Sequence, residues 1–260
     1  MSEEEKSSEN SEGKDPTFEH IMEFEVETME KKEKERLEDI EELSSKLQNT
    51  SKNKDRAQIL DLIGEHPTYG EIADILINVA LEDKYQLCRA KAVSLLADLI
   101  REEEVKQAIL QTLNDSSHLV RLWSVWALRS IISDDNIRDI LIRKLKYGEV
   151  SNRVKLWIIR ALSDRIDDDE IIYVFISLLK SRPNTEMKKL ILYYILQKAE
   201  NPEISMVLST YILNETNKEI RREIVKRLLE IENEDVTYSL ERLLKQEKDE
   251  EIRKLLKVKF

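Results

Sequence analysis

The sequence has few residues that break helices and few that build reactive sites. Its 260 residues include four glycines, four prolines, three histidines and one cysteine. So little glycine and proline is typical of helices joined by short turns. A single cysteine, Cys88, excludes an internal disulfide, which favours a reducing compartment and a cytoplasmic location.

The usual motifs of catalysis are also missing. No Walker-type loop, no Gly-x-Ser-x-Gly elbow and no Cys-x-x-Cys pair occurs in the sequence. The histidines, His20, His66 and His118, have no partner at metal-ligand spacing. The acidic run 167–170 opens an expected helix, where capping explains it better than a bound cation. We therefore expect no enzymatic activity, no metal and no cofactor.

Long apolar runs are absent as well. No stretch approaches the roughly 18 consecutive apolar residues that a membrane-spanning helix requires. The first residues, Met-Ser-Glu-Glu-Glu, lack the basic start and the apolar middle of a signal peptide. We expect no membrane association.

The net charge of −11 is concentrated at one end of the chain. Residues 1–50 hold 7 Lys and Arg against 17 Asp and Glu, a balance of −10, and the rest is close to neutral. We expect residues 1–32 to form an acidic, largely disordered leader. Within it, residues 17–30 carry apolar side chains at helical spacing and form a candidate amphipathic segment. Residues 33–260 are expected to form one domain.

That domain repeats itself, and one basic residue marks each repeat. The marker residues lie 33, 32, 34, 33, 33 and 32 residues apart, in the order Arg56, Arg89, Arg121, Lys155, Lys188, Arg221 and Arg253. A fixed period of this size predicts a solenoid of stacked helix pairs. Including a helix within 33–48, we expect first helices near 70–81, 103–114, 135–147, 168–181, 201–214 and 233–246. Second helices are expected near 53–64, 85–100, 117–132, 150–165, 185–199, 217–231 and 249–260.

The text around the markers resembles HEAT repeats, including the variant called phycobilisome-lyase-like. Val120-Arg121-x-x-Ser124-x-x-Ala127-Leu128 carries the resemblance most clearly. The resemblance implies an all-α, right-handed α-solenoid of about seven helix pairs, related to armadillo-like folds. It also implies a concave groove lined by second helices. It does not specify a function, because the family includes scaffolds, transport receptors, regulatory subunits and a few enzymes.

Acidic residues stand six positions before most markers: Asp83, Asp115, Glu149, Glu215 and Glu247. Thr50 and Arg182 take this position in the two other repeats. An acidic side chain at a helix start is favoured by the helix dipole. It can also pair with the marker of its own repeat or of the adjacent repeat. HEAT proteins use a comparable Asp–Arg ladder, so we interpret the markers as ladder members rather than ligand contacts.

On a helical wheel, four positions lie on the core side of each second helix. They are the position one residue before the marker and the positions three, four and seven residues after it. Positions one and five after the marker point the opposite way, and position two lies on the flank. The groove is therefore expected to be aromatic and aliphatic in its middle and basic toward its C-terminal end. The candidate partner-binding residues are Leu122, Trp123, Trp126, Leu156, Trp157, Arg160, Lys189, Tyr193, Arg222 and Lys226.

All three tryptophans of the chain fall in this predicted patch. Exposed Trp beside Arg is the composition of interaction hot spots. The alternative for Trp123 and Trp157 is that these flank residues pack against the next repeat.

The function predicted first is a non-enzymatic scaffold or adaptor that binds an acidic or amphipathic segment of a protein partner in the groove. The leader segment 17–30 has this character, so the leader either folds back and competes with partners or merely aids solubility.

The alternative function is nucleic-acid binding by a basic stripe of the second helices. HEAT-like DNA glycosylases place Trp and Asp at a lesion, but the position four after each Trp here is Ala127, Ser130 or Ala161 and never a carboxylate. The near-neutral solenoid also disfavours strong phosphate binding. Resemblance to a bilin lyase would rest on repeat shape alone.

Overall fold

The chain folds into helices that alternate in direction along one stack. The computed structural model describes residues 39–65 and 69–260, which contain helices and connecting turns and no β-strand. Residues 39–49 are helical. The following α-helices are α2 (Asn53–Gly64), α3 (Tyr69–Glu82), α4 (Gln86–Leu96), α5 (Glu103–Thr112), α6 (His118–Arg129), α7 (Asp135–Arg143), α8 (Asn152–Ser163), α9 (Asp169–Lys180), α10 (Thr185–Leu196), α11 (Pro202–Ile212), α12 (Lys218–Leu228), α13 (Glu234–Gln246) and α14 (Glu250–Lys257).

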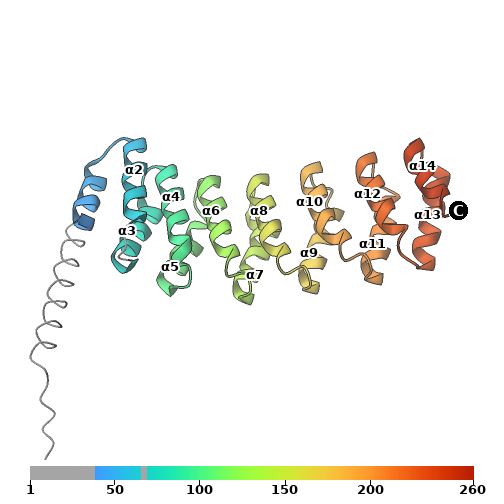
Figure 1. Cartoon of the computed structure of the whole chain (residues 1–260), viewed down its shortest axis with the longest axis horizontal. Coiled ribbons are helices and arrows are strands. Elements are labelled where there is room, and N and C mark those ends of the chain that lie inside the picture. The colour runs from blue at the N-terminus through green and yellow to red at the C-terminus, as the bar shows by residue number, and fades with distance from the viewer. Residues whose placement is uncertain (1–38, 66–68) are drawn as a thin grey trace, which may run out of the picture.

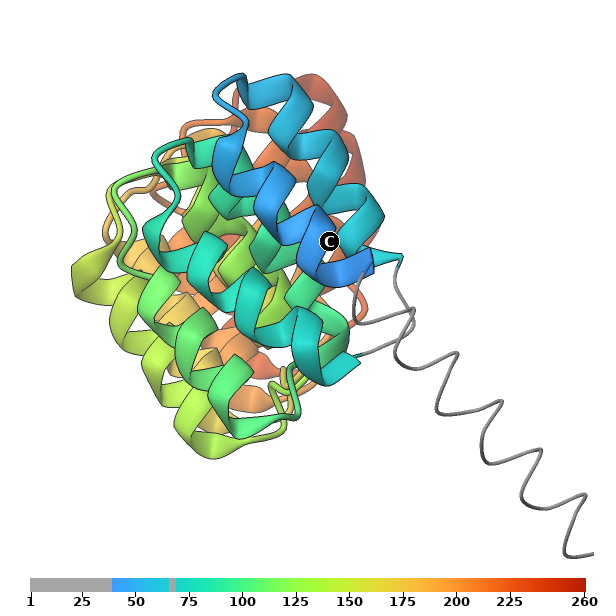
Figure 2. The ribbon, with the colours of Figure 1, turned by 90° about the vertical axis from the view of Figure 1, so that its left-hand side faces the viewer.

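These helices form two rows (Figure 1). The even-numbered second helices α2 to α14 lie along one edge of the stack, and the odd-numbered first helices α3 to α13 lie along the other. The rows follow a shallow arc with the second helices on its concave side, and the view along the stack shows successive pairs turning past one another (Figure 2). The predicted right-handed α-solenoid is confirmed. The predicted leader, residues 1–32, and its segment 17–30 lie outside the described residues.

Two helices end differently from the prediction. The expected helix 85–100 stops at Leu96 and continues as a 3₁₀ turn, η1 (Ala97–Leu99). The expected helix 135–147 ends as a π turn, η2 (Lys144–Gly148). This turn lies in the longest repeat, the 34 residues from Arg121 to Lys155. A π turn accommodates one extra residue without shifting the next helix, which explains its place.

The core consists of the faces that the wheel assigned to it. Positions four and seven after the marker are almost fully buried in the first six repeats. Position four holds Leu60, Val93, Val125, Ile159, Leu192 and Val225. Position seven holds Ile63, Leu96, Leu128, Leu162, Ile195 and Leu228. Burying each such side chain contributes about 1.5–3 kcal/mol, so neighbouring repeats stabilise one another through this continuous core.

Side-chain caps begin many of the helices. Asp168 accepts a hydrogen bond from the N–H of Glu170 at the start of α9, and Asn217 accepts from two N–H groups at the start of α12. Each cap satisfies amides that the helix itself leaves without partners. The capping interpretation of the acidic run 167–170 is confirmed. No group of three His, Cys, Asp or Glu with metal-binding geometry occurs among the residues that the structure describes.

None of the helices in the described ranges is both long and apolar enough to cross a membrane. Cys88 is buried against Asn53 of the preceding repeat, and burial raises the pKa of its thiol. A protonated, buried thiol behaves as a small apolar side chain, as its position in the repeat predicted.

The marker residues reach forward to the acidic residue of the next repeat. The guanidinium of Arg89 donates to both carboxylate oxygens of Asp115 at 2.7 and 2.8 Å. Arg121 donates to both oxygens of Glu149 at 2.8 Å. An ion pair at the same place recurs in Arg56–Asp83, Lys188–Glu215 and Arg221–Glu247. The predicted ladder is confirmed, and its rungs join adjacent repeats.

Each rung also holds the turn inside a repeat. Arg121 donates to the main-chain carbonyl of Asp115 at 2.8 Å, while Glu149 accepts the N–H of Ser151 at 2.7 Å. The Glu149 side chain is fully buried, so its charge is tolerable only because these donors surround it. One carboxylate therefore closes its own turn and binds the preceding repeat.

The ladder has one gap, between α8 and α10. Lys155 is the marker of α8, but Arg182 stands where the next repeat should supply an acid. This junction carries two cations and no carboxylate, and neither cation has an ion pair within the described residues. Arg182 also has a φ of 56°, which costs a non-glycine residue on the order of 1 kcal/mol.

The ladder makes stability depend on pH. Burial alone would raise the pKa of the Glu149 carboxyl, but hydrogen bonds from Arg121 and the Ser151 N–H, with the charge of Arg121, lower it below its ordinary value. The pKa values of Asp115, Glu215 and Glu247 are lowered in the same way. The stabilisation is complete above the unfolded-state pKa of about 4 and is lost as the pH falls through the lower folded-state pKa.

We expect Glu149→Gln to lower the free energy of unfolding by about 2 kcal/mol at neutral pH, because it removes the charge that Arg121 binds. The deficit should shrink as the pH falls below about 4, because the wild type then progressively loses the stabilisation that its ionised Glu149 provides. Urea denaturation at neutral and acid pH measures both. Glu104→Gln, an exposed carboxylate of α5, serves as the control and should change little. A deficit that stays constant with pH contradicts this account.

Filling the gap should stabilise the stack. We expect the carboxylate of Arg182→Glu to come within reach of Lys155, as Glu215 reaches Lys188 at 2.9 Å, and to add about 0.5–1 kcal/mol of stability. Lys180→Glu makes the same change of charge at an exposed site outside the ladder and should give no such gain. Differential scanning calorimetry gives the melting temperature of each variant. Equal melting temperatures for the two variants would contradict the proposed ladder geometry.

Candidate functional site

Trp126 lies on the concave row of helices, in the C-terminal half of α6. Its side chain is 41% exposed, although tryptophan is a large apolar residue. The ring of Trp123 meets it edge-on, with centroids 5.3 Å apart and planes at 75°. Trp123 is itself half-buried against the core. Trp126 is thus an exposed ring that a packed neighbour holds in place.

The next second helix carries a different aromatic arrangement. Trp157 of α8 is half-buried against the core, and the guanidinium of Arg160 lies over its ring at 5.4 Å. An Arg that stacks on an indole keeps its planar donors free for a carboxylate. The alternative interpretation, that Trp123 and Trp157 pack within the stack, accounts for the buried part of both rings.

Tyr193 continues the series on α10. It occupies the same repeat position as Trp126 and Arg160, is 63% exposed, and meets Tyr194 edge-on at 5.2 Å. We call Trp123, Trp126, Trp157, Arg160 and Tyr193 the concave aromatic patch. Its members lie on three consecutive second helices of the concave row (Figure 1).

Two predicted members of the groove are not on the surface. Leu122 and Leu156 are buried, so their assignment to the binding surface is wrong. The position one after the marker lies at the seam between neighbouring second helices. Lys189 shows this, because it reaches Glu219 of the next second helix. Leucine at the same position fills the seam instead of facing a partner.

The basic end of the predicted groove is largely neutralised. Lys189 pairs with Glu219 at 2.6 Å, and Arg222 pairs with Glu251 at 3.0 Å, each across a seam. Lys226 pairs with Glu223 of its own helix at 3.1 Å. The sequence predicted where these cations lie, but it did not predict their acidic partners. Only Arg160 among the predicted cations has no ion pair within the described residues.

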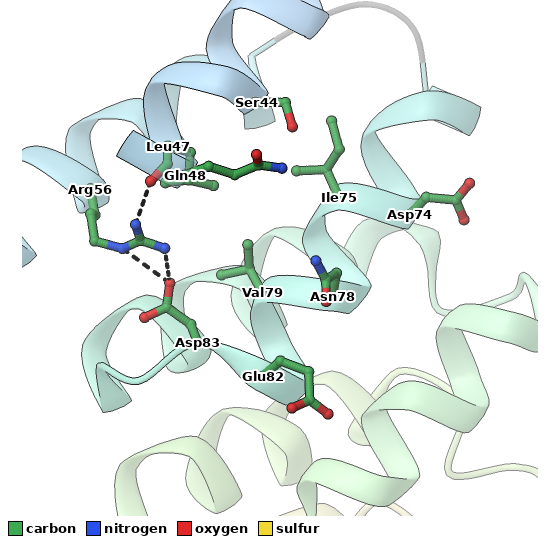
Figure 3. A pocket seen from close by; sticks show the side chains of 10 residues that line it. All are labelled: Ser44, Leu47, Gln48, Arg56, Asp74, Ile75, Asn78, Val79, Glu82 and Asp83. Carbon is green, nitrogen blue, oxygen red and sulfur yellow. Dashed lines mark hydrogen bonds and ion pairs between the residues drawn. The ribbon is translucent and has the colours of Figure 1, made fainter. Parts of the chain in front are cut away.

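A pocket of about 360 Å³ lies at the start of the stack, between helix 39–49 and α3 (Figure 3). Its charged pair is the first rung of the ladder, Arg56 with Asp83. Arg56 also donates to the carbonyls of Leu47 and Thr50. The two charged groups of this rung therefore bind one another and nearby carbonyls, and the pocket belongs to a junction between repeats.

A second set of exposed apolar residues lies on the first helices, where the prediction placed no site. Tyr173, Met206 and Tyr238 occupy one repeat position of α9, α11 and α13. Their spacing of 33 and 32 residues is readable in the sequence. The prediction overlooked them because it considered surface positions only on the second helices.

No family model and no curated protein sequence matches the chain. Among solved structures, Escherichia coli YibA is similar, with a TM-score of 0.55 and 19% identity over 85% of this chain and 81% of that chain. The complex of CpcE and CpcF of phycocyanin lyase from Nostoc aligns with a TM-score of 0.44 and 16% identity over 100% of both chains.

YibA is a HEAT-like repeat protein, and the likeness to it extends over most of both chains. At this level of identity the likeness concerns the fold. Together with the marker period and the ladder, it establishes that this chain has a HEAT-like helical-repeat fold.

Proposed function

We propose that the protein is a non-enzymatic scaffold of the cytoplasm that binds a segment of a protein partner at the concave aromatic patch. The observation that carries the proposal is the exposed ring of Trp126, held edge-on by Trp123. Rigid aromatic side chains bury much area at a small cost in conformational entropy, which is why they dominate binding energy at interfaces.

Arg160 and Tyr193 extend the patch along the row and add polar groups. Arg160 offers its planar N–H donors beside Trp157. The exposed Tyr193, on the neighbouring second helix α10, offers its hydroxyl group. An amphipathic segment with apolar residues and at least one carboxylate suits this combination. The partner envisaged is thus mainly apolar, with fewer acidic contacts than a basic groove would require.

The finer resemblance to phycobilisome-lyase-like repeats concerns repeat shape, and the proposal includes no lyase step. It does not extend to nucleic acid either. The markers that made the second helices basic, such as Arg121 and Arg221, are bound to carboxylates of the ladder. Phosphate binding needs cations that are free to replace counterions.

The proposal predicts that Trp126→Ala/Arg160→Glu loses partners that the wild type captures, by about tenfold or more, because the central ring and the free guanidinium are removed. Quantitative affinity capture measures the loss. The control variant Tyr147→Ala/Lys146→Glu, at the exposed turn before α8, also replaces one aromatic residue and reverses one positive charge, but outside the patch. It should retain the partners that the wild type captures. Partners kept by both variants would place the binding surface elsewhere.

The acidic leader is proposed to compete for the patch. All three tryptophans lie in the patch, so their fluorescence reports on it directly. Deleting residues 1–30 should make Trp126 more accessible to acrylamide and tighten partner binding several-fold, since an intramolecular competitor is lost. A synthetic peptide of residues 17–30 should reverse both effects. Unchanged quenching and affinity would leave the leader a solvated tail.

A further inference from the structure

The first helices present an apolar stripe on the side of the stack away from the concave row. Tyr173, Met206 and Tyr238 are 59%, 52% and 62% exposed. They stand at one repeat position on the consecutive first helices α9, α11 and α13. Large apolar residues scattered singly over a surface need no explanation, but three in register along a solenoid form one continuous feature.

Each stripe residue is at the centre of its helix's solvent face. On α9, Ile172 and Val174 beside Tyr173 are buried, whereas Glu170 and Ser177, one turn away, are exposed. The equivalent positions of α3 and α5 are the polar Asp74 and Gln107. The stripe therefore belongs to the C-terminal half of the stack, and the repeat period alone does not require it.

Carboxylates flank the stripe. The first turns of α9, α11 and α13 carry exposed acids. One of them, Glu203, accepts a hydrogen bond from the Tyr173 hydroxyl at 3.0 Å, which links α9 to α11. Acids along this border of the stripe favour a partner that brings cations to it.

A hollow of about 450 Å³ lies beside Tyr238 at the end of the stripe. Glu232, Glu234 and Glu241 line it, and none has an ion pair among the described residues. Its one cation, Lys259, donates instead to main-chain carbonyls at the end of α12. The hollow thus offers three carboxylates to a cation from outside.

We propose that the stripe docks a basic amphipathic helix of a partner protein, with its apolar side chains on Tyr173, Met206 and Tyr238 and a Lys or Arg in the hollow. Packed helices lie about 8–10 Å apart, so the stripe residues recur at about that interval. Seven residues of an α-helix rise about 10.5 Å, so one apolar residue per heptad matches one stripe residue per repeat.

This surface is separate from the concave aromatic patch. The stripe lies on the first helices, and the patch lies on the second helices (Figure 1). The two sites also select opposite charges, because Arg160 lies beside the patch whereas glutamates border the stripe. If the proposal for one site is refuted, the proposal for the other still stands, because the variants that test the two sites share no residue.

The test uses the full chain and a fluorescein-labelled synthetic helix with leucine on one face and lysine on the other, followed by fluorescence anisotropy. Tyr173→Ser/Met206→Ser/Tyr238→Ser should weaken binding by about fivefold or more, since it removes the apolar contacts. Glu234→Gln/Glu241→Gln should also weaken it, by about threefold or more, and should reduce its salt dependence.

Two matched variants control for unspecific adhesion. Tyr147→Ser/Val150→Ser removes exposed apolar residues off the stripe, and Glu102→Gln/Glu104→Gln removes exposed acids at the start of α5. Each should change the affinity by less than about twofold. The proposal is overturned if the wild type does not bind the peptide, if controls and stripe variants weaken binding equally, or if only Trp126→Ser weakens it.

Discussion

The rungs of the ladder are the interaction on which the rest of the structure depends. A stacked repeat buries its apolar face only against its neighbours, so the stack needs something that fixes how far each pair rotates past the last. Apolar packing tolerates some sliding, but a guanidinium with two parallel bonds to a carboxylate has one geometry. Arg121 with Glu149 sets that geometry for α6 and α8, and the same carboxylate closes the turn before α8.

Because the rungs set the arc, they also set the surfaces. The second helices hold Trp126, Arg160 and Tyr193 at one repeat position, and the register between repeats aligns them along the concave row. The same register aligns Tyr173 with Met206 on the opposite row. Neither surface needs an irregular loop, because each repeat contributes one or two side chains to a surface that the stack assembles. Changing the binding preference of such a surface requires only surface substitutions, which cost the core little.

Much of this fold could be predicted because the marker period and the helical wheel are local. The period located the helix pairs, the acids six residues before the markers suggested the rungs, and the wheel assigned the buried faces. The wheel failed for Leu122 and Leu156, because it describes one helix and says nothing of the neighbour that covers them. For the same reason the wheel did not reveal the acidic partners of Lys189 and Arg222. These partners, Glu219 and Glu251, lie about thirty residues away in sequence, on the next second helix.

The two halves of the stack are joined differently. In α4, α6 and α8 the seam position holds Ala90, Leu122 and Leu156, all buried, whereas α10 and α12 carry Lys189 and Arg222 paired with glutamates across the seam. Buried leucines exclude water from the seam, whereas the ion pairs join long side chains that stay partly exposed. The gap at Lys155 and Arg182 lies at this boundary, and the exposed stripe of the first helices begins there, on α9. The half with apolar seams therefore carries the centre of the aromatic patch, and the half with ion-paired seams carries the stripe.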